Sequence, residues 1–196
     1  MNMPQITRES LMTLEAYAKA RPEFRNKVMA HKKNRTVHLG KNVTLIFEDE
    51  LTIRYQIQEM LRIEKTFDED GIQDEIEAYN PLVPDGSNWK ATMMIEYPDE
   101  TERRAMLAKL KGIENRVWVQ VMDFTRVHAI ADEDLERENE EKTSSVHFLR
   151  FELTPDMVAA AKHGAAIAMG VDHPVYSAEI VAHQLVRDSL AADLKG

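Results

Sequence analysis

The sequence has 196 residues, enough for one large domain or two small ones, and its formal net charge is −9. It contains no cysteine, which excludes disulfides, cysteine nucleophiles, iron–sulfur clusters and cysteine zinc sites. No apolar run approaches the roughly 18 residues of a membrane-spanning helix, and the first ten residues lack a secretory signal pattern. We therefore expect one cytoplasmic domain over residues 1–196, with no membrane contact.

Basic and acidic residues are unevenly distributed along the chain. Residues 1–45 carry a charge of +6 and the remainder carries −15. The basic residues could face an anionic partner, or they could dock on the acidic surface of the same chain or of a second copy. No aromatic side chains interleave with them as base stacking requires, and a chain at −9 repels polyanions, so the pattern argues against nucleic acid.

The first 35 residues are predicted to form a helical segment that packs on the rest of the domain. Thr7 is placed to cap a first helix, and Pro22 suits the first turn of a second one. Residues 36–39 and 43–47 have the β-branched content of two strands joined by a turn.

A long helix is predicted to follow, and its broad apolar face contains a carboxylate, Glu64. Such a residue is costly to bury unless it is paired or protonated. Glu64 is therefore either a functional acid–base group or a structural residue, paired with an arginine such as Arg150 or located at a dimer interface. The apolar face consists of Ile53, Ile57, Met60, Leu61, Ile63 and Phe67.

A stiff loop follows a second, shorter helix. Residues 80–88 contain two prolines and a glycine, and Asp85, Ser87 and Asn88 add short polar side chains. Such a loop can hold a small ligand with little ordering cost. It can equally cap the next strand through local hydrogen bonds.

The remaining pattern predicts an α+β fold. A mainly antiparallel, mixed sheet is expected from residues 90–97, 117–130 and 146–153, with helices packed on one face. Residues 132–141 are acidic but lack the glycine of a calcium loop, so a solvated segment is expected. On the last of these strands, His147 lies among apolar neighbours as either a satisfied core histidine or a general base.

Sequence motifs for familiar chemistry are absent. No glycine-rich phosphate loop, nucleophile elbow or HExxH metal motif occurs. Asp172, His173 and His183 could meet in space as a metal site, because two histidines and a carboxylate need no fixed spacing. No cofactor is predicted.

Five segments, residues 47–62, 79–88, 96–98, 132–137 and 146–153, carry a family resemblance. Together they resemble the bacterial family called Domain of Unknown Function 3501, over nearly the whole chain. The resemblance implies no catalytic residues. Genes of this family tend to lie beside a rubrerythrin and an iron–sulfur oxidoreductase, so it implies a link to oxidative stress or redox physiology.

Three functional hypotheses follow. The first is a non-enzymatic accessory or small-ligand-binding protein that is linked to rubrerythrin or the oxidoreductase. Its pocket would lie between the long helix and the 80–88 loop, and the ligand contacts would come from Arg54, Arg62, Asn80, Asp85, Ser87 and Asn88. The second is an enzyme that uses Glu64 or Glu59 as general base beside His147. The third is a metalloprotein using Asp172 and His173, and a homodimer is expected in each case.

Overall fold

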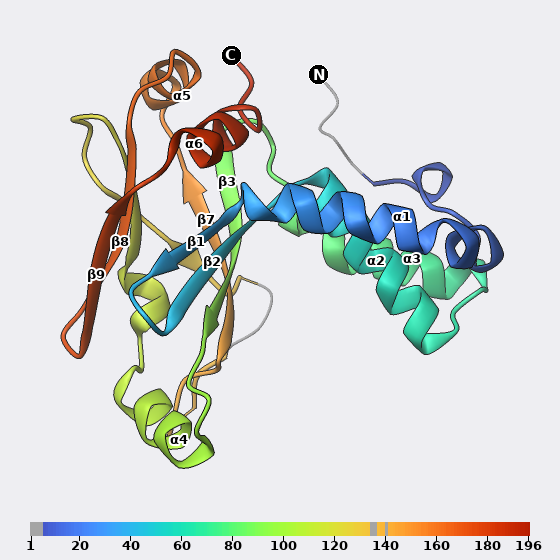
Figure 1. Ribbon diagram of the computed structural model, residues 1–196, viewed down its shortest axis with the longest axis horizontal. Helices are drawn as coiled ribbons and strands as arrows, with labels where there is room; N and C mark the ends of the chain where they lie inside the picture. The colour runs from blue at the N-terminus through green and yellow to red at the C-terminus, as the bar shows by residue number, and fades with distance from the viewer. Residues whose placement is uncertain (1–5, 134–136, 140) are drawn as a thin grey trace.

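The computed structural model describes residues 6–133, 137–139 and 141–196. Two antiparallel sheets pack against each other, and a group of three helices, here called the helical arm, projects from one side (Figure 1). The predicted α+β class is confirmed. The helical arm consists of α1 (Leu14–Lys33), α2 (Glu50–Glu64) and α3 (Glu69–Tyr79).

The first sheet, sheet A, has the strand order β1-β2-β3-β7-β6. It consists of β1 (Thr36–Leu39), β2 (Val43–Glu48), β3 (Asn88–Ile95), β7 (Val146–Glu152) and β6 (Ile130–Ala131). The second sheet, sheet B, has the order β5-β4-β8-β9. It consists of β5 (Val127–His128), β4 (Val117–Val121), β8 (Ile167–His173) and β9 (Tyr176–Val181).

The division into two sheets corrects one expectation. The strand at 117–121 pairs with β8 and β5, and not with β3 or β7. An alternating pattern specifies which face of a strand is buried, but it carries no information about which strand lies beside it. The other helices flank the sandwich: α4 (Glu100–Lys109), α5 (Pro155–Lys162), α6 (Gln184–Ala191), and the short 3₁₀ helices η1 (Arg8–Ser10), η2 (Asn80–Leu82) and η3 (Ile113–Arg116).

The core lies between the two sheets. Trp89, Ala91 and Met93 of β3 point into it, as do Leu149 and Phe151 of β7. Because side chains alternate along a strand, the intervening residues form the opposite, outer face of sheet A. This outer face includes Lys90, Thr92 and Met94 of β3 and Phe148, Arg150 and Glu152 of β7.

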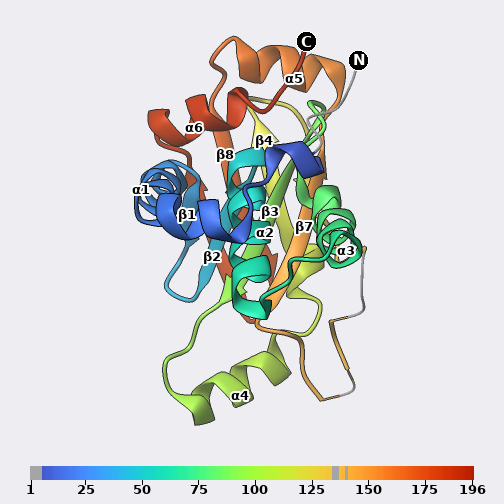
Figure 2. The same cartoon turned by 90° about the vertical axis from the view of Figure 1, so that its right-hand side faces the viewer.

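The helical arm has a separate apolar cluster and lies over the outer face of sheet A. Ile53, Ile57 and Leu61 of α2 pack against Ile72 and Ile76 of α3. Figure 2 shows α2 and α3 in front of β3 and β7. Among the described residues, no helix has the length and apolar character needed to cross a membrane.

Helix α1 is continuous, whereas two helices were expected. Thr13 is its N-cap and accepts a hydrogen bond from the Ala16 amide. Pro22 lies inside the helix and leaves the Ala18 carbonyl without its usual donor. Ala18 is exposed, so water can satisfy that carbonyl and the helix continues.

Candidate functional site

A cavity of about 910 Å³ lies between α3, η2 and the outer face of sheet A. Ligand pockets in proteins typically measure roughly 300–1,000 Å³. Its walls combine apolar side chains with charged ones. The apolar walls include Ile6, Ile76, Leu82, Val83 and Phe148, and the charged residues are Arg8, Glu9, Glu77, Asp85, Lys90, Glu133 and Arg150.

The 80–88 loop forms one wall and is held by its own polar side chains. Asn80 accepts a hydrogen bond from the Ile6 amide and donates one to the Ile6 carbonyl, both at 2.9 Å. Asp85 accepts from the Ser87 amide at 2.8 Å and from its hydroxyl at 2.7 Å. Asn88 accepts from the Asp85 amide at 3.0 Å. The loop therefore caps β3, which is one of the two roles considered from the sequence, and its residues 80–85 also line the cavity.

Two cations lie side by side on the floor of the cavity. Lys90 and Arg150 are directly opposite each other in the β3–β7 register. The Arg150 guanidinium donates two hydrogen bonds to Glu133, at 2.8 and 2.7 Å, and another to Glu152. Arg150 in turn lowers the pKa of Glu133.

Lys90 has different partners. Its ammonium donates to the Pro81 carbonyl at 2.8 Å, and none of the described carboxylates forms an ion pair with it. Burial, and then the positive charge of Arg150, lower the pKa of Lys90. Lys90 is not among the residues predicted from the sequence, because nothing in the strand pattern distinguishes it from a solvated lysine.

Arg54 and Arg62 do not line this cavity, which corrects the predicted ligand site. Arg54 pairs with Glu50 at 3.1 Å, and its guanidinium lies 5.7 Å from the centre of the Phe24 ring of α1. Arg62 donates to Glu59 at 3.1 Å. Ser87 and Asn88 also lie outside the lining, whereas Asn80 and Asp85 belong to it.

Glu64 is exposed, so the expectation that its carboxylate is buried on the apolar face is wrong. Helix α2 ends there, and Lys65 follows in the left-handed region with a φ of 55°. The apolar stripe continues past the core of the arm, leaving Ile63 61% exposed and Phe67 79% exposed. The suggested pairing with Arg150 is absent too, because Arg150 binds Glu133 and Glu152.

Glu59 is a partly buried carboxylate of α2, and it faces α1. It accepts hydrogen bonds from Arg21 at 2.7 and 3.0 Å, from the Tyr17 hydroxyl at 2.7 Å, and from Arg62. The Arg21 hydrogen bonds, with those from Tyr17 and Arg62, lower the pKa of Glu59 to about 2. A carboxylate so strongly held in its charged form is a weak proton acceptor and a good link between helices.

His147 is a core histidine whose ring nitrogens both have partners. Its Nδ1 lies 2.5 Å from Asp132 Oδ2, and its Nε2 lies 2.9 Å from the Thr143 hydroxyl and 3.0 Å from the Ser144 carbonyl oxygen. The side chain is fully buried, and Glu114 Oε2 lies 4.0 Å away. Its partners come from residues 114–144 and not from α2, so the predicted pairing of His147 with Glu59 or Glu64 is absent.

The proposed metal ligands are not brought together. His173 donates from Nε2 to the Lys111 carbonyl at 3.0 Å and accepts the Val175 amide at Nδ1. Asp172 points to the other face of β8, where it lies 3.6 Å from His128, and His183 is an exposed residue at the start of α6. Within the part of the chain that the structure describes, no three His, Asp or Glu side chains are arranged to hold a metal ion.

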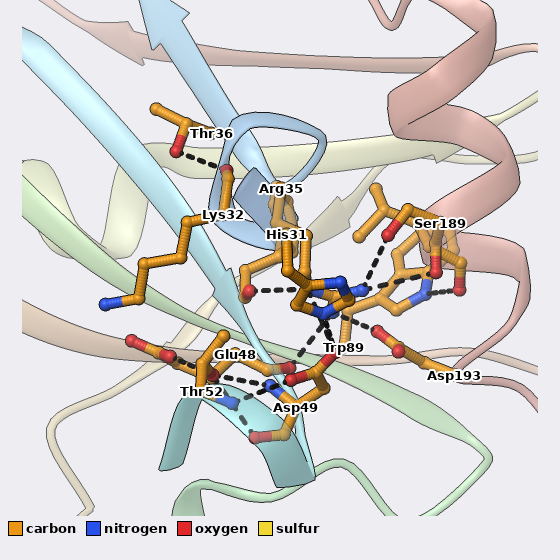
Figure 3. A network of polar contacts seen from close by, with 12 residues as sticks. His31, Lys32, Arg35, Thr36, Glu48, Asp49, Thr52, Trp89, Ser189 and Asp193 are labelled. Atoms are coloured by element: carbon orange, nitrogen blue, oxygen red, sulfur yellow. Dashed lines mark hydrogen bonds and ion pairs between the residues drawn. The ribbon is translucent and has the colours of Figure 1, made fainter. Parts of the chain in front are cut away.

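A second polar cluster surrounds Arg35, where the arm meets the sandwich (Figure 3). The Arg35 guanidinium donates to the carbonyls of Phe47 and Glu48, to Ser189, and to Asp193. His31 contacts Asp49 at 2.5 Å beside it. Every guanidinium nitrogen has a partner, so this cluster joins the arm, sheet A and α6 and leaves no donor for a ligand.

The fold and the cavity together define a two-sheet α+β protein with a ligand-sized pocket under a helical arm. The chain belongs to the family described as "Protein of unknown function (DUF3501)", whose model matches residues 5–194. The predicted resemblance is thus confirmed.

The chain is also similar to a solved structure from Burkholderia pseudomallei K96243, described as a novel protein of unknown function. The two sequences are 59% identical, and the match covers 97% of this chain and 100% of the other with a TM-score of 0.93. A comparison with curated proteins gives no significant match.

Proposed function

We propose that this protein binds a small organic anion with an apolar portion in the cavity between α3, η2 and sheet A. One observation carries the proposal. Lys90 is a half-buried residue on the cavity floor, and its ammonium forms no ion pair with any of the described carboxylates. A partly desolvated cation gains more from an incoming carboxylate or phosphate than a hydrated surface lysine does.

The other walls restrict the remainder of the ligand. Ile76, Leu82 and Phe148 offer apolar contacts, and apolar side chains form most of the lining of small-molecule pockets. Glu77 and Asp85 line the same cavity and are acceptors for hydroxyl or amine groups. A compact hydroxy acid, keto acid or phosphate ester with a short carbon chain fits this arrangement.

The proposal is tested by binding. Thermal-shift and calorimetric measurements with a panel of small carboxylates and phosphate esters should yield ligands that stabilise the wild-type protein. Lys90→Met should lose that stabilisation, whereas Lys27→Met, which removes an exposed charge on α1, should retain it. Equal binding by both variants, or no ligand in the panel, would refute this function.

The accessory role is a further part of the proposal, and the family resemblance supports it. The ligand-loaded protein would then contact rubrerythrin or the iron–sulfur oxidoreductase in the cytoplasm. Affinity purification from cells that produce all three proteins should enrich one of the two partners with this protein. The absence of enrichment would remove this role while leaving the binding function in place.

The homodimer stays a prediction, which sedimentation velocity can test.

A further inference from the structure

We infer that Lys90 is a nucleophilic amine that captures a ligand of this cavity covalently, by forming an imine with its aldehyde or ketone group. The inference rests on the proposed function and adds the chemical class of ligand, a small anion that also carries a carbonyl group. The amine nitrogen attacks the carbonyl carbon and the oxygen takes up a proton. The resulting carbinolamine then loses water, so that amine and carbonyl yield imine and water with no oxidant or reductant.

The position of Lys90 suits a nucleophile that must be held in place. It lies on β3, which is hydrogen-bonded to β2 on one side and to β7 on the other. Its nitrogen donates to the Pro81 carbonyl on the proline-containing loop at 2.8 Å. A carbonyl accepts from a neutral amine as well as from an ammonium, so this contact persists when the nitrogen loses a proton.

The surroundings of Lys90 favour the neutral amine that attack requires. Arg150 is its direct neighbour on β7, and such neighbours on one face have Cβ atoms roughly 4.5–5.5 Å apart. Burial is the largest cause that lowers the pKa of Lys90, and this like charge is the second largest. The acidic groups that oppose this effect are Glu133, Asp85 and Glu152.

Each of those carboxylates has a hydrogen-bond partner other than Lys90. Glu133 and Glu152 both bind the Arg150 guanidinium, and Asp85 accepts two hydrogen bonds from Ser87. None of the three forms an ion pair with Lys90. Glu77 of α3 also lines the cavity, on the opposite wall.

The direct test is trapping with a defined probe. The full-length protein is incubated with a trace of pyridoxal 5′-phosphate, which carries both an aldehyde and an anion, and then reduced with sodium borohydride. Peptide mass analysis gives the labelling rate of each lysine. Lys90 should react several-fold faster than exposed Lys27 and Lys33, and the midpoint of its rate against pH should lie below theirs.

Two variants test the cause of the fast labelling and the identity of the labelled residue. Arg150→Gln removes the like charge and should slow labelling at Lys90 while leaving Lys27 unchanged. Lys90→Arg retains the cation and should abolish the adduct. Labelling of Lys90 at or below the rate of the exposed lysines in the wild-type protein would overturn the inference without reference to any variant.

Failure of the inference is distinguishable from failure of the proposed function. If a small anion stabilises both the wild type and Lys90→Arg while no adduct forms at Lys90, covalent capture is wrong and anion binding stands. If no anion binds and Lys90 is not trapped, both are wrong. If Lys90 is trapped, and a non-carbonyl anion from the panel blocks that trapping, both the covalent capture and the anion binding are supported.

Discussion

Arg35, in the segment after α1, and Asp193, in the segment after α6, form an ion pair, although 158 positions separate them in the chain. Arg35 is 1% exposed, and it also donates hydrogen bonds to the Phe47 and Glu48 carbonyls and to Ser189. This contact joins the helical arm to the sandwich at a point where the two apolar clusters do not merge.

Arg35→Met should therefore destabilise the protein strongly. Removing one partner of a buried ion pair typically costs about 3–5 kcal/mol, because the other charge stays buried without compensation. Urea unfolding at neutral pH measures the loss. Lys33→Met, two positions earlier and exposed, should change the unfolding free energy by less than about 0.5 kcal/mol, and equal losses for the two variants would contradict the role of Arg35.

Asp193 should give the protein an unusual pH dependence. Burial raises the pKa of this carboxyl to about 6 in the folded protein, against an ordinary value of 3.8. Between these values the folded state binds more protons than the unfolded state, so this group's contribution to stability falls as pH rises from about 4 to about 6. Asp193→Asn should flatten that slope in urea titrations, and an unchanged slope would assign the effect elsewhere.

Glu59→Gln and Glu64→Gln form a matched pair on α2. Glu59→Gln weakens the hydrogen bonds from Arg21 and should cost about 1.5–3 kcal/mol, the range for hydrogen bonds to charged groups. Glu64 is exposed, so Glu64→Gln should cost less than about 0.5 kcal/mol.

The same two variants should respond differently to acid. Because the pKa of Glu59 is lowered from 4.5 to about 2, its contribution is present above pH 4.5 and is lost as pH falls toward 2. The stability difference between wild type and Glu59→Gln should therefore shrink over that interval, whereas the Glu64→Gln difference should stay near zero. A constant Glu59→Gln difference down to pH 2 would contradict the ion pair.

Thr143→Val should destabilise the region around His147. The substitution preserves side-chain volume but removes the hydroxyl that lies 2.9 Å from Nε2. Weakening the hydrogen bonding of a buried polar group costs about 1–3 kcal/mol. Thr143→Ser keeps the hydroxyl and should lose less, as thermal unfolding can show; the reverse order would mean that the methyl group matters more than the hydrogen bond.

Asn80→Ala should release the segment at Ile6 from the cavity wall. It removes the two 2.9 Å hydrogen bonds that Asn80 makes with the Ile6 main chain. Hydrogen exchange at the Ile6 amide should then accelerate, with a loss of about 1–2 kcal/mol in global stability. Gln73→Ala, an exposed change on α3, should leave that amide protected.

Local chemistry made part of this protein predictable from sequence. Apolar and polar residues largely alternate along 90–97 and 146–153, and this pattern indicates which of them enter the core, because side chains on a strand have a period of two. The prolines and glycine of 80–88 predicted a stiff wall, and the structure places Asn80 and Asp85 on the cavity. These are properties of neighbouring residues, so no tertiary information was needed.

The structure alone decided the partners of each residue. Helical periodicity placed Glu64 on the apolar face of α2, yet burial ends at Leu61, and the shielded carboxylate is Glu59, which packs against α1. Lys90 became a candidate only through its register with Arg150 and its contact with Pro81. Sequence determines which faces are apolar and where the chain turns, whereas the charge and burial of a side chain depend on distant segments that only the folded chain brings beside it.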